Sequence, residues 1–238
     1  MNRKIIAFLI LVISSASLFA QTSGRDFSSD ISVQAVGGYS NTRLFYGGMD
    51  MKGALHINNI DLNLNVEALS LSTFSFGLTA SPHLKLNDKL MLFADGTLHT
   101  RLFHDYRTYE FVYAFSLGLK MRHLSAQVGL FSRAIDDMDR QWHDTDNFIA
   151  EPFNLLYRVM LSLMGFDNSW DIFVCVSDFN EFEYERMWEP IMSLGAKYHI
   201  INNKMSVVAE TSLKPSGMFH LVASFYSVWM KAGITYKF

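Results

Sequence analysis

The chain has 238 residues, of which 50% are hydrophobic and only 18% are charged, and its formal net charge is −3. Soluble domains usually carry charges on nearer a quarter of their residues, so this composition is apolar for a soluble protein. The absence of a basic excess excludes an electrostatic nucleic-acid-binding surface, and no nucleic-acid partner is expected.

The first 20 residues have the pattern of a secretory signal peptide. Arg3 and Lys4 form a positive start, residues 5–13 are an unbroken apolar run, and small residues lead up to Ala20. This pattern predicts Sec-type export with cleavage near Ala20, which leaves residues 21–238 as one mature domain. The alternative is a retained anchor, although the apolar run is shorter than the about 20 residues that a spanning helix needs.

The mature chain alternates between apolar and polar residues with a period of two. Residues 60–68, for example, place Ile, Leu, Leu, Val and Ala at even positions and Asp, Asn, Asn and Glu between them. This alternation is typical of a strand with one apolar and one polar face. It predicts twelve strands, with ten as the nearest alternative, at residues 30–38, 47–57, 60–69, 73–86, 89–102, 109–121, 124–133, 153–164, 170–178, 187–200, 204–214 and 218–238.

The predicted connections alternate in length. The tight ones contain turn-forming residues and lie at 58–59, 87–88, 122–123, 165–169 and 201–203. The others are mostly longer and polar, and the longest covers residues 134–152. Short turns on one side and longer loops on the other are typical of an all-β, transmembrane, antiparallel up-and-down β-barrel, whose strands close on themselves because lipid offers no hydrogen-bond partners. An even number of strands puts both ends of the barrel on the short-turn side.

Glycine and aromatic residues are distributed as this barrel would require. Glycines on the polar faces relieve crowding where the wall curves inward, and they are Gly77, Gly118, Gly129, Gly195 and Gly233. Aromatic residues gather at strand ends, as the belts at membrane–water interfaces do. Those near the short turns are Trp170, Tyr198, Tyr236 and Phe238, and those near the other end are Phe45, Tyr46, Phe103, Tyr109, Phe153, Phe179 and Trp188.

The polar faces also carry charges of both signs. The residues predicted to face the lumen are Asp61, Glu67, Asp95, Arg101, Lys120, Arg133, Arg158, Asp171, Lys197, Glu210 and Lys231. Ionisable groups inside a spanning segment need ion-pair partners or water. They predict either a pore that selects solutes or a lattice of ion pairs that fills the barrel, because twelve strands lie between the packed and the open barrel sizes.

The connection at 134–152 contains a cluster of acidic residues with one histidine, namely Asp136, Asp137, Asp139, His143, Asp144 and Asp146. Carboxylates favour a calcium site, and the Asp and His content resembles that of omptin outer-membrane proteases. Omptin catalytic groups come from opposite walls of the barrel, whereas these residues share one loop. A solvated acidic loop is therefore favoured, and no catalytic residue, metal or cofactor is predicted.

Histidine, serine and cysteine residues offer few other candidates for chemistry. His220 and Ser224 are the pair nearest to the arrangement in the outer-membrane phospholipase, which also has twelve strands, but its His-x-Ser-Asn-Gly motif is absent. His83 and His199 are expected to face the lumen near the short turns, as members of the ion-pair lattice. Cys175, the only cysteine, excludes an internal disulfide and is expected to be a small lumen-facing filler.

The last predicted strand carries a family resemblance. Lys231, Gly233, Tyr236 and Phe238 are spaced as polar-x-Gly-x-x-aromatic-x-aromatic. This spacing resembles the C-terminal signal of bacterial outer-membrane proteins that is read by the barrel assembly machinery, and it covers only residues 231–238. The resemblance implies a place in the outer membrane of a diderm (Gram-negative) bacterium. It also implies outer-membrane lipids, the assembly machinery and, during transit, periplasmic chaperones as partners.

These features predict the fold more narrowly than the function. The leading hypothesis is a small porin-like channel or a structural protein of the cell surface. The alternatives are an outer-membrane enzyme, either a lipid hydrolase or a protease at the rim, and a surface adhesin that acts through residues 134–152 and 178–187. Conductance in a bilayer would favour the channel, whereas hydrolysis that depends on His143 or His220 would favour the enzyme.

Overall fold

In a computed structural model, the chain forms twelve antiparallel strands. The structure describes residues 27–40, 44–69, 73–103, 107–137, 149–164, 169–178, 190–201, 204–216 and 224–238, so the expected signal peptide lies outside the described residues. The strands are β1 (Phe27–Ser40), β2 (Leu44–Ile57), β3 (Ile60–Leu69), β4 (Thr73–Asn87), β5 (Leu90–Phe103), β6 (Thr108–Met121), β7 (Leu124–Asp137), β8 (Ile149–Met164), β9 (Trp170–Ser177), β10 (Ile191–Ile201), β11 (Met205–Ser216) and β12 (Ser224–Lys237).

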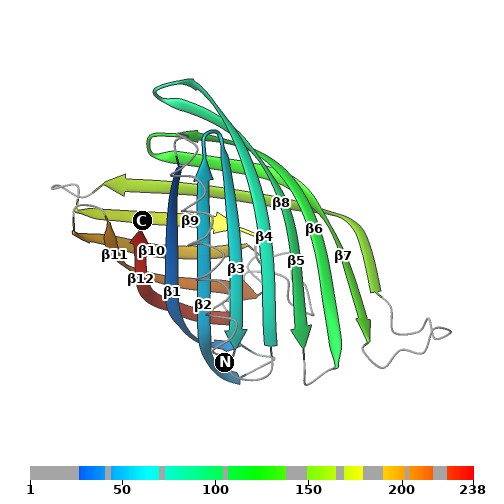
Figure 1. Ribbon diagram of the computed structural model, residues 1–238. Coiled ribbons are helices and arrows are strands. Elements are labelled where there is room, and N and C mark those ends of the chain that lie inside the picture. Colours follow the sequence, from blue (N-terminus) through cyan, green and yellow to red (C-terminus); the bar gives the residue numbers. More distant parts are fainter. Residues whose placement is uncertain are drawn as a thin grey trace.

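The strands form one closed sheet, which confirms the predicted twelve-stranded barrel. Each strand pairs with its neighbours in the chain, and β1 pairs with β12 to complete the circle. Figure 1 shows this closure, with the blue first strand beside the red last strand. At the seam Ala35 lies opposite Ala232, within a register that runs from Asp30 to Ser40 on β1. Closure leaves no unpaired sheet edge, which a lipid environment would penalise.

Both ends of the barrel chain lie at the rim that carries the short turns. Phe27 at the start of β1 is opposite Ile57, next to the turn at residues 58–59, and Asp30 is opposite Lys237. We call this end the short-turn rim. Asn58 has a φ of 52°, the left-handed conformation that asparagine tolerates better than most residues in tight hairpin turns.

The prediction of a connection over residues 134–152 is wrong in its length, because the strands on both sides extend into this range. β7 continues to Asp137 and β8 begins at Ile149, so only residues 138–148 lie outside the described part. The strands extend because the alternation continues, with Ile135 buried at 1% exposure and paired in register with Ile149. β10 also begins later than predicted, at Ile191. The preceding residue is Pro190, which has no N–H to donate to a sheet.

Side chains on the outside of the barrel are large and apolar. On β6, Phe111, Phe115 and Leu117 are each more than 40% exposed, whereas Glu110 and Val112 on the opposite face are fully buried. In a membrane protein these exposed side chains meet lipid, so their exposure has no solvation cost. Among the described residues, none forms a helix that is long and apolar enough to cross a membrane.

The aromatic residues near the rims divide between the two faces. At the short-turn rim the rings of Trp170 and Tyr198 lie 4.6 Å apart, and those of Tyr236 and Phe238 lie 4.9 Å apart. At the other rim Phe45 and Phe153 are 82% and 80% exposed. Tyr109 is also exposed, whereas Phe179 and Trp188 lie outside the described residues.

Two of the predicted belt residues, however, belong to the interior. Phe103 is 1% exposed, and Tyr46 lines a cavity inside the barrel. Assigning them to the outer belt from their place at strand ends was therefore wrong. The position of a residue along a strand does not fix its face; the alternation does.

Candidate functional site

The structure places the predicted lumen charges on the inward side of their strands. Arg101, Arg158 and Glu210 line the same internal cavity as Glu67 and Lys231. The remaining ones occupy positions that alternate with the lipid-facing residues, as the strand registers show for Asp61, Asp95, Lys120, Arg133, Asp171 and Lys197. Their common orientation follows from the period of two, and it concentrates ionisable groups inside the barrel.

Many of these charges form a single row around the lumen. Across β2 to β6 the register joins Asp50, Glu67, Ser75, Arg101 and Glu110 as successive partners. Two residues away from this register lie Arg133 and its partner Glu151 on β7 and β8 at one end, and Lys231 and its register partner Glu210 on β12 and β11 at the other. We call these charged residues and Ser75 the charged belt. Register partners have Cβ atoms about 4.5–5.5 Å apart, so the belt brings unlike charges within reach of one another.

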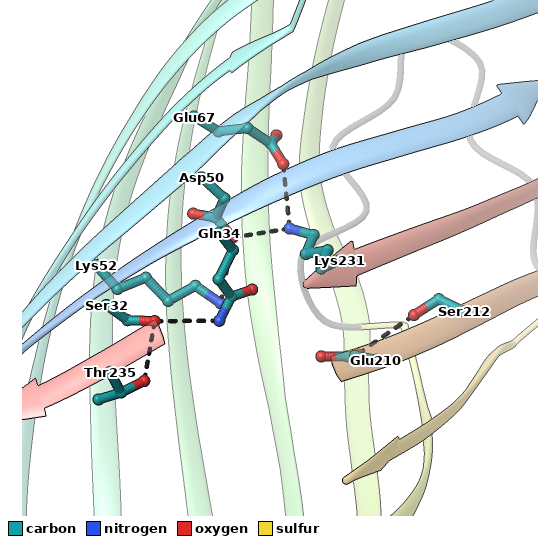
Figure 2. A network of polar contacts seen from close by, with 9 residues as sticks. All are labelled: Ser32, Gln34, Asp50, Lys52, Glu67, Glu210, Ser212, Lys231 and Thr235. Carbon is teal, nitrogen blue, oxygen red and sulfur yellow. Dashed lines mark hydrogen bonds and ion pairs between the residues drawn. The ribbon is translucent and has the colours of Figure 1, made fainter. Parts of the chain in front are cut away.

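Lys231 is a cation of the charged belt that contacts two carboxylates on other strands. Its Nζ atom lies 2.9 Å from Asp50 Oδ2 and 3.1 Å from Glu67 Oε1. Figure 2 shows the side chain reaching from β12 toward β2 and β3, past the intervening strand β1. Asp50 is fully buried and also lies 3.3 Å from Lys52. Lys231 therefore ties the last strand to the second and third strands across the closing seam.

A second cluster of the charged belt lies on β6, β7 and β8. Arg133 is 3.4 Å from Glu110 and 3.2 Å from Glu151, and the side chains of Arg133 and Glu110 are 3% and 0% exposed. Asn154 adds a hydrogen bond to Glu151 at 3.2 Å. Removing one partner from such a buried pair leaves an uncompensated charge, which is strongly destabilising. This cluster fixes the relative positions of three strands.

The lumen is packed on one side. Val112, Phe131 and Leu156 point inward from β6, β7 and β8, and each is 3% exposed or less. Ala114 packs against the same group. This apolar cluster fills the space inside β6–β8, so that part of the barrel resembles the core of a soluble protein.

The other side of the lumen is hollow. A cavity of about 180 Å³ lies against β1–β3, β5 and β8–β12, and we call it the lumenal cavity. Charged residues in its wall include Lys52 and Arg158 together with members of the charged belt, and its aromatic residues are Tyr46, Phe173 and Trp229. Cys175 also lies in the wall of this cavity. The lumen thus combines the two alternatives, a filled barrel and an open one.

Aromatic rings lie over two of the inward-facing glycines. A Cβ atom on Gly118 would meet the ring of Phe93, its register partner, and a Cβ on Gly195 would meet the ring of Phe173. The glycine lets each ring lie against the wall of the barrel, an arrangement known to stabilise sheet glycines. The ring at Gly195 therefore borders the lumenal cavity without crossing it.

Near the short-turn rim, inward carboxylates are matched with histidines. His199 Nε2 lies 2.9 Å from Asp171 Oδ2. Asp61 lies 2.7 Å from His56 and 3.8 Å from His83. Among the described residues, none of the His, Cys, Asp and Glu side chains form a group of three or more that could hold a metal ion.

Several charged residues that face the lumen were not predicted from the sequence. Asp50 and Lys52 lie in a segment predicted as strand, where Met49 and Met51 alternate with them, so the alternation alone could have identified both. Glu110 follows the same rule in β6. Glu151 was missed because residues 134–152 were assigned to a loop.

The acidic cluster and the serine–histidine pair do not form a site among the described residues. Asp136 belongs to β7 and accepts a hydrogen bond from Tyr109 Oη at 3.0 Å. Asp139, His143, Asp144 and Asp146 lie outside the described residues, as does His220. Ser224 begins β12.

Comparisons with known proteins identify the fold. No family model and no curated protein matches the chain. Among solved structures, it is similar to the KdgM porin in complex with disordered oligogalacturonate, with a TM-score of 0.55 at 11% identity, over 88% of this chain and 99% of that one. The KdgM porin alone gives 0.52 at 9% identity, over 87% and 99%, and the NanC porin gives 0.51 at 12% identity, over 86% and 98%. The chain thus has the fold of outer-membrane β-barrels and is structurally similar to small porins.

Proposed function

We propose that this barrel is a passive channel through which small hydrophilic solutes cross the outer membrane. The observation that carries the proposal is the lumenal cavity, a hollow with charged walls inside a closed barrel. The fold similarity covers nearly the whole length of the KdgM and NanC porins and supports the same conclusion. The KdgM porin is in complex with a disordered oligogalacturonate, a polar sugar.

The composition of the wall explains why water and solutes would enter. Charged groups of both signs favour a hydrated interior over an empty one, because a dry cavity would leave them unsolvated. The cavity, with a volume of about 180 Å³, is large enough to hold several water molecules. The packed cluster on β6–β8 narrows the lumen further. We therefore expect a narrow pore that passes small solutes and has low conductance.

Swelling of liposomes that contain the purified protein tests this proposal. Two neighbouring residues of β10 give a matched pair, because Ser193 lines the cavity and Leu194 is 58% exposed on the lipid side. Swelling in a small neutral sugar is expected for the wild type and for Leu194→Trp, and Ser193→Trp is expected to slow it several-fold. A wild-type barrel that is folded but gives no swelling would contradict the proposed channel.

We also infer how the chain reaches the membrane. Residues 1–20 direct Sec-type export, and Lys231, Gly233, Tyr236 and Phe238 form the signal for the barrel assembly machinery after passage with periplasmic chaperones. The edge-to-face contact of Phe238 with Tyr236, with 62% of Phe238 exposed, supports a surface that another protein contacts. Phe238→Ser is expected to reduce the amount of protein in the outer membrane, whereas Phe153→Ser, at the opposite rim, is not.

A further inference from the structure

Two charged side chains in the wall of the lumenal cavity have no oppositely charged partner among the residues that the structure describes. Arg158 on β8 makes no ion pair or side-chain hydrogen bond with any residue that the structure describes. Glu210 on β11 accepts a hydrogen bond from Ser212 at 3.3 Å, and within the described part of the chain it contacts no cation. Figure 2 shows that Lys231, the register partner of Glu210, points instead toward Asp50 and Glu67.

These two side chains occupy opposite ends of one polar wall. Strands β9 and β10 lie between β8 and β11, so the backbones of Arg158 and Glu210 are three strand spacings apart, about 14 Å across the strands. They are also offset along the strands, because Arg158 is level with Ile191 on β10 and Glu210 is level with Gly195, four residues or about 13 Å further on. Both residues line the same cavity, so one solute inside it can reach the two side chains. The wall between them carries the hydroxyl groups of Ser177 and Ser193.

The surroundings restrict what can bind. Lys52, Lys231 and Glu67 in the same wall are already members of ion pairs, so their charges are compensated. A solute with only negative charges would be attracted by Arg158 but repelled by Glu210. A solute with a carboxylate at one end and an ammonium group at the other would meet a complementary charge at both. Phe173 and Trp229 offer apolar contact for the atoms between those ends. A guanidinium binds a carboxylate through two parallel hydrogen bonds, which makes Arg158 well suited to that end.

We propose that Arg158 and Glu210 form the two ends of a binding site for a small amphoteric solute, one that carries a carboxylate and an ammonium group several atoms apart. The proposal rests on the channel function above and specifies its class of substrate. Binding at such a site is weak, because a solute that crosses a pore must also leave it.

Ligand-observed NMR on the detergent-folded protein measures this binding without requiring conductance. The probe is 4-aminobutyrate, and acetate and ethylammonium serve as analogues with one charge each. We expect 4-aminobutyrate to bind more tightly than either analogue. We also expect Arg158→Gln and Glu210→Gln each to weaken its binding by about tenfold, because each variant removes one charge-assisted contact. Lys197→Gln removes an inward charge outside the cavity wall and is expected to leave binding unchanged.

The analogues separate the two ends of the site. Arg158→Gln should abolish the binding of acetate and leave that of ethylammonium intact, and Glu210→Gln should do the opposite. Equal binding of acetate and 4-aminobutyrate, or binding that neither variant changes, would overturn the proposal. Liposome swelling on the same samples separates the two claims. Binding without swelling would contradict the proposed channel and support the binding site. Swelling without binding would contradict the binding site alone.

Discussion

At the scale of single residues, the stability of the barrel interior depends on the pairing of its buried charges. Asp50 is fully buried, and its negative charge is compensated by Lys231 and Lys52. Transfer of a charge out of water is costly, and only close pairing makes it acceptable in a barrel wall. The stability of the closing seam, where β1 lies between β12 and β2, therefore depends on Lys231.

Replacing Lys231 by methionine tests that dependence. The variant leaves Asp50 and Glu67 without their shared cation, and we expect the free energy of unfolding to fall by about 3 kcal/mol, as for other broken buried pairs. Urea unfolding in lipid vesicles, followed by tryptophan fluorescence, measures the change. Lys120→Met removes an exposed inward cation and serves as the control. The double variant with Asp50→Asn should recover part of the loss, and a single variant as stable as the wild type would refute this role.

The sequence predicts the orientation of these residues but not their partners. The alternation along β12 and β3 places Lys231 and Glu67 on the inner face, as was expected. Lys231 bonds to Asp50, 181 residues away in the chain, rather than to its register partner Glu210. That choice depends on how β1 and β12 close the barrel, and local patterns carry no information about it.

At the scale of strands, facing residues on neighbouring strands determine how much room the lumen has. Phe173 and Gly195 are register partners on β9 and β10, and the ring occupies the space where a Cβ of residue 195 would lie. The pair keeps an aromatic residue in the wall while leaving the cavity beside it open.

A methyl group at position 195 should therefore disturb both packing and permeation. We expect Gly195→Ala to displace the Phe173 ring into the cavity and to destabilise the barrel by about 1–3 kcal/mol, the usual cost of overpacking. Swelling should also slow. Gly96→Ala is the matched control, because nothing lies within 4 Å of a Cβ there. If Gly195→Ala and Gly96→Ala have the same free energy of unfolding and the same swelling rate, the position of the Phe173 ring does not depend on Gly195.

The extent of the strands was predictable wherever apolar and polar residues alternate without interruption. β3 and its turn at 58–59 were predicted residue for residue. β7 and β8 were predicted too short, because the cluster of acidic residues that begins at Asp136 suggested a loop. Pro152 lies beside a register shift between Phe131 and Arg133. At such an irregularity the sheet does not require the N–H donor that proline lacks.

At the scale of the whole molecule, closure turns an alternating sequence into a barrel. The pairing of β1 with β12 joins residues about 200 positions apart in the chain, as Thr235 does when it donates a hydrogen bond to Ser32 at 3.1 Å. Twelve strands were predictable from the sequence. The uneven filling of the lumen was not, because it depends on which inward side chains face each other across the barrel.

A cross-strand disulfide tests the closing register. Ala35 and Ala232 are direct partners and both are exposed on the outer face. Antiparallel partners have Cα atoms about 4.5–5.5 Å apart, within the range of a disulfide. In a Cys175→Ser background, cysteines at 35 and 232 should oxidise to one species that migrates differently on a non-reducing gel after boiling. Cysteines at 35 and 234, which are not partners, should oxidise less, and equal yields would contradict the register.

The central claim is that the lumen conducts, and single-channel recording in a planar bilayer tests it most directly. The protein should give small, discrete current steps. In a Cys175→Ser background, a bulky water-soluble thiol reagent should reduce the steps of Lys52→Cys, which lines the cavity, and leave those of Met49→Cys, which faces lipid. A folded barrel that gives no steps, or steps that modification at residue 52 leaves unchanged, would show that solutes do not pass along this wall.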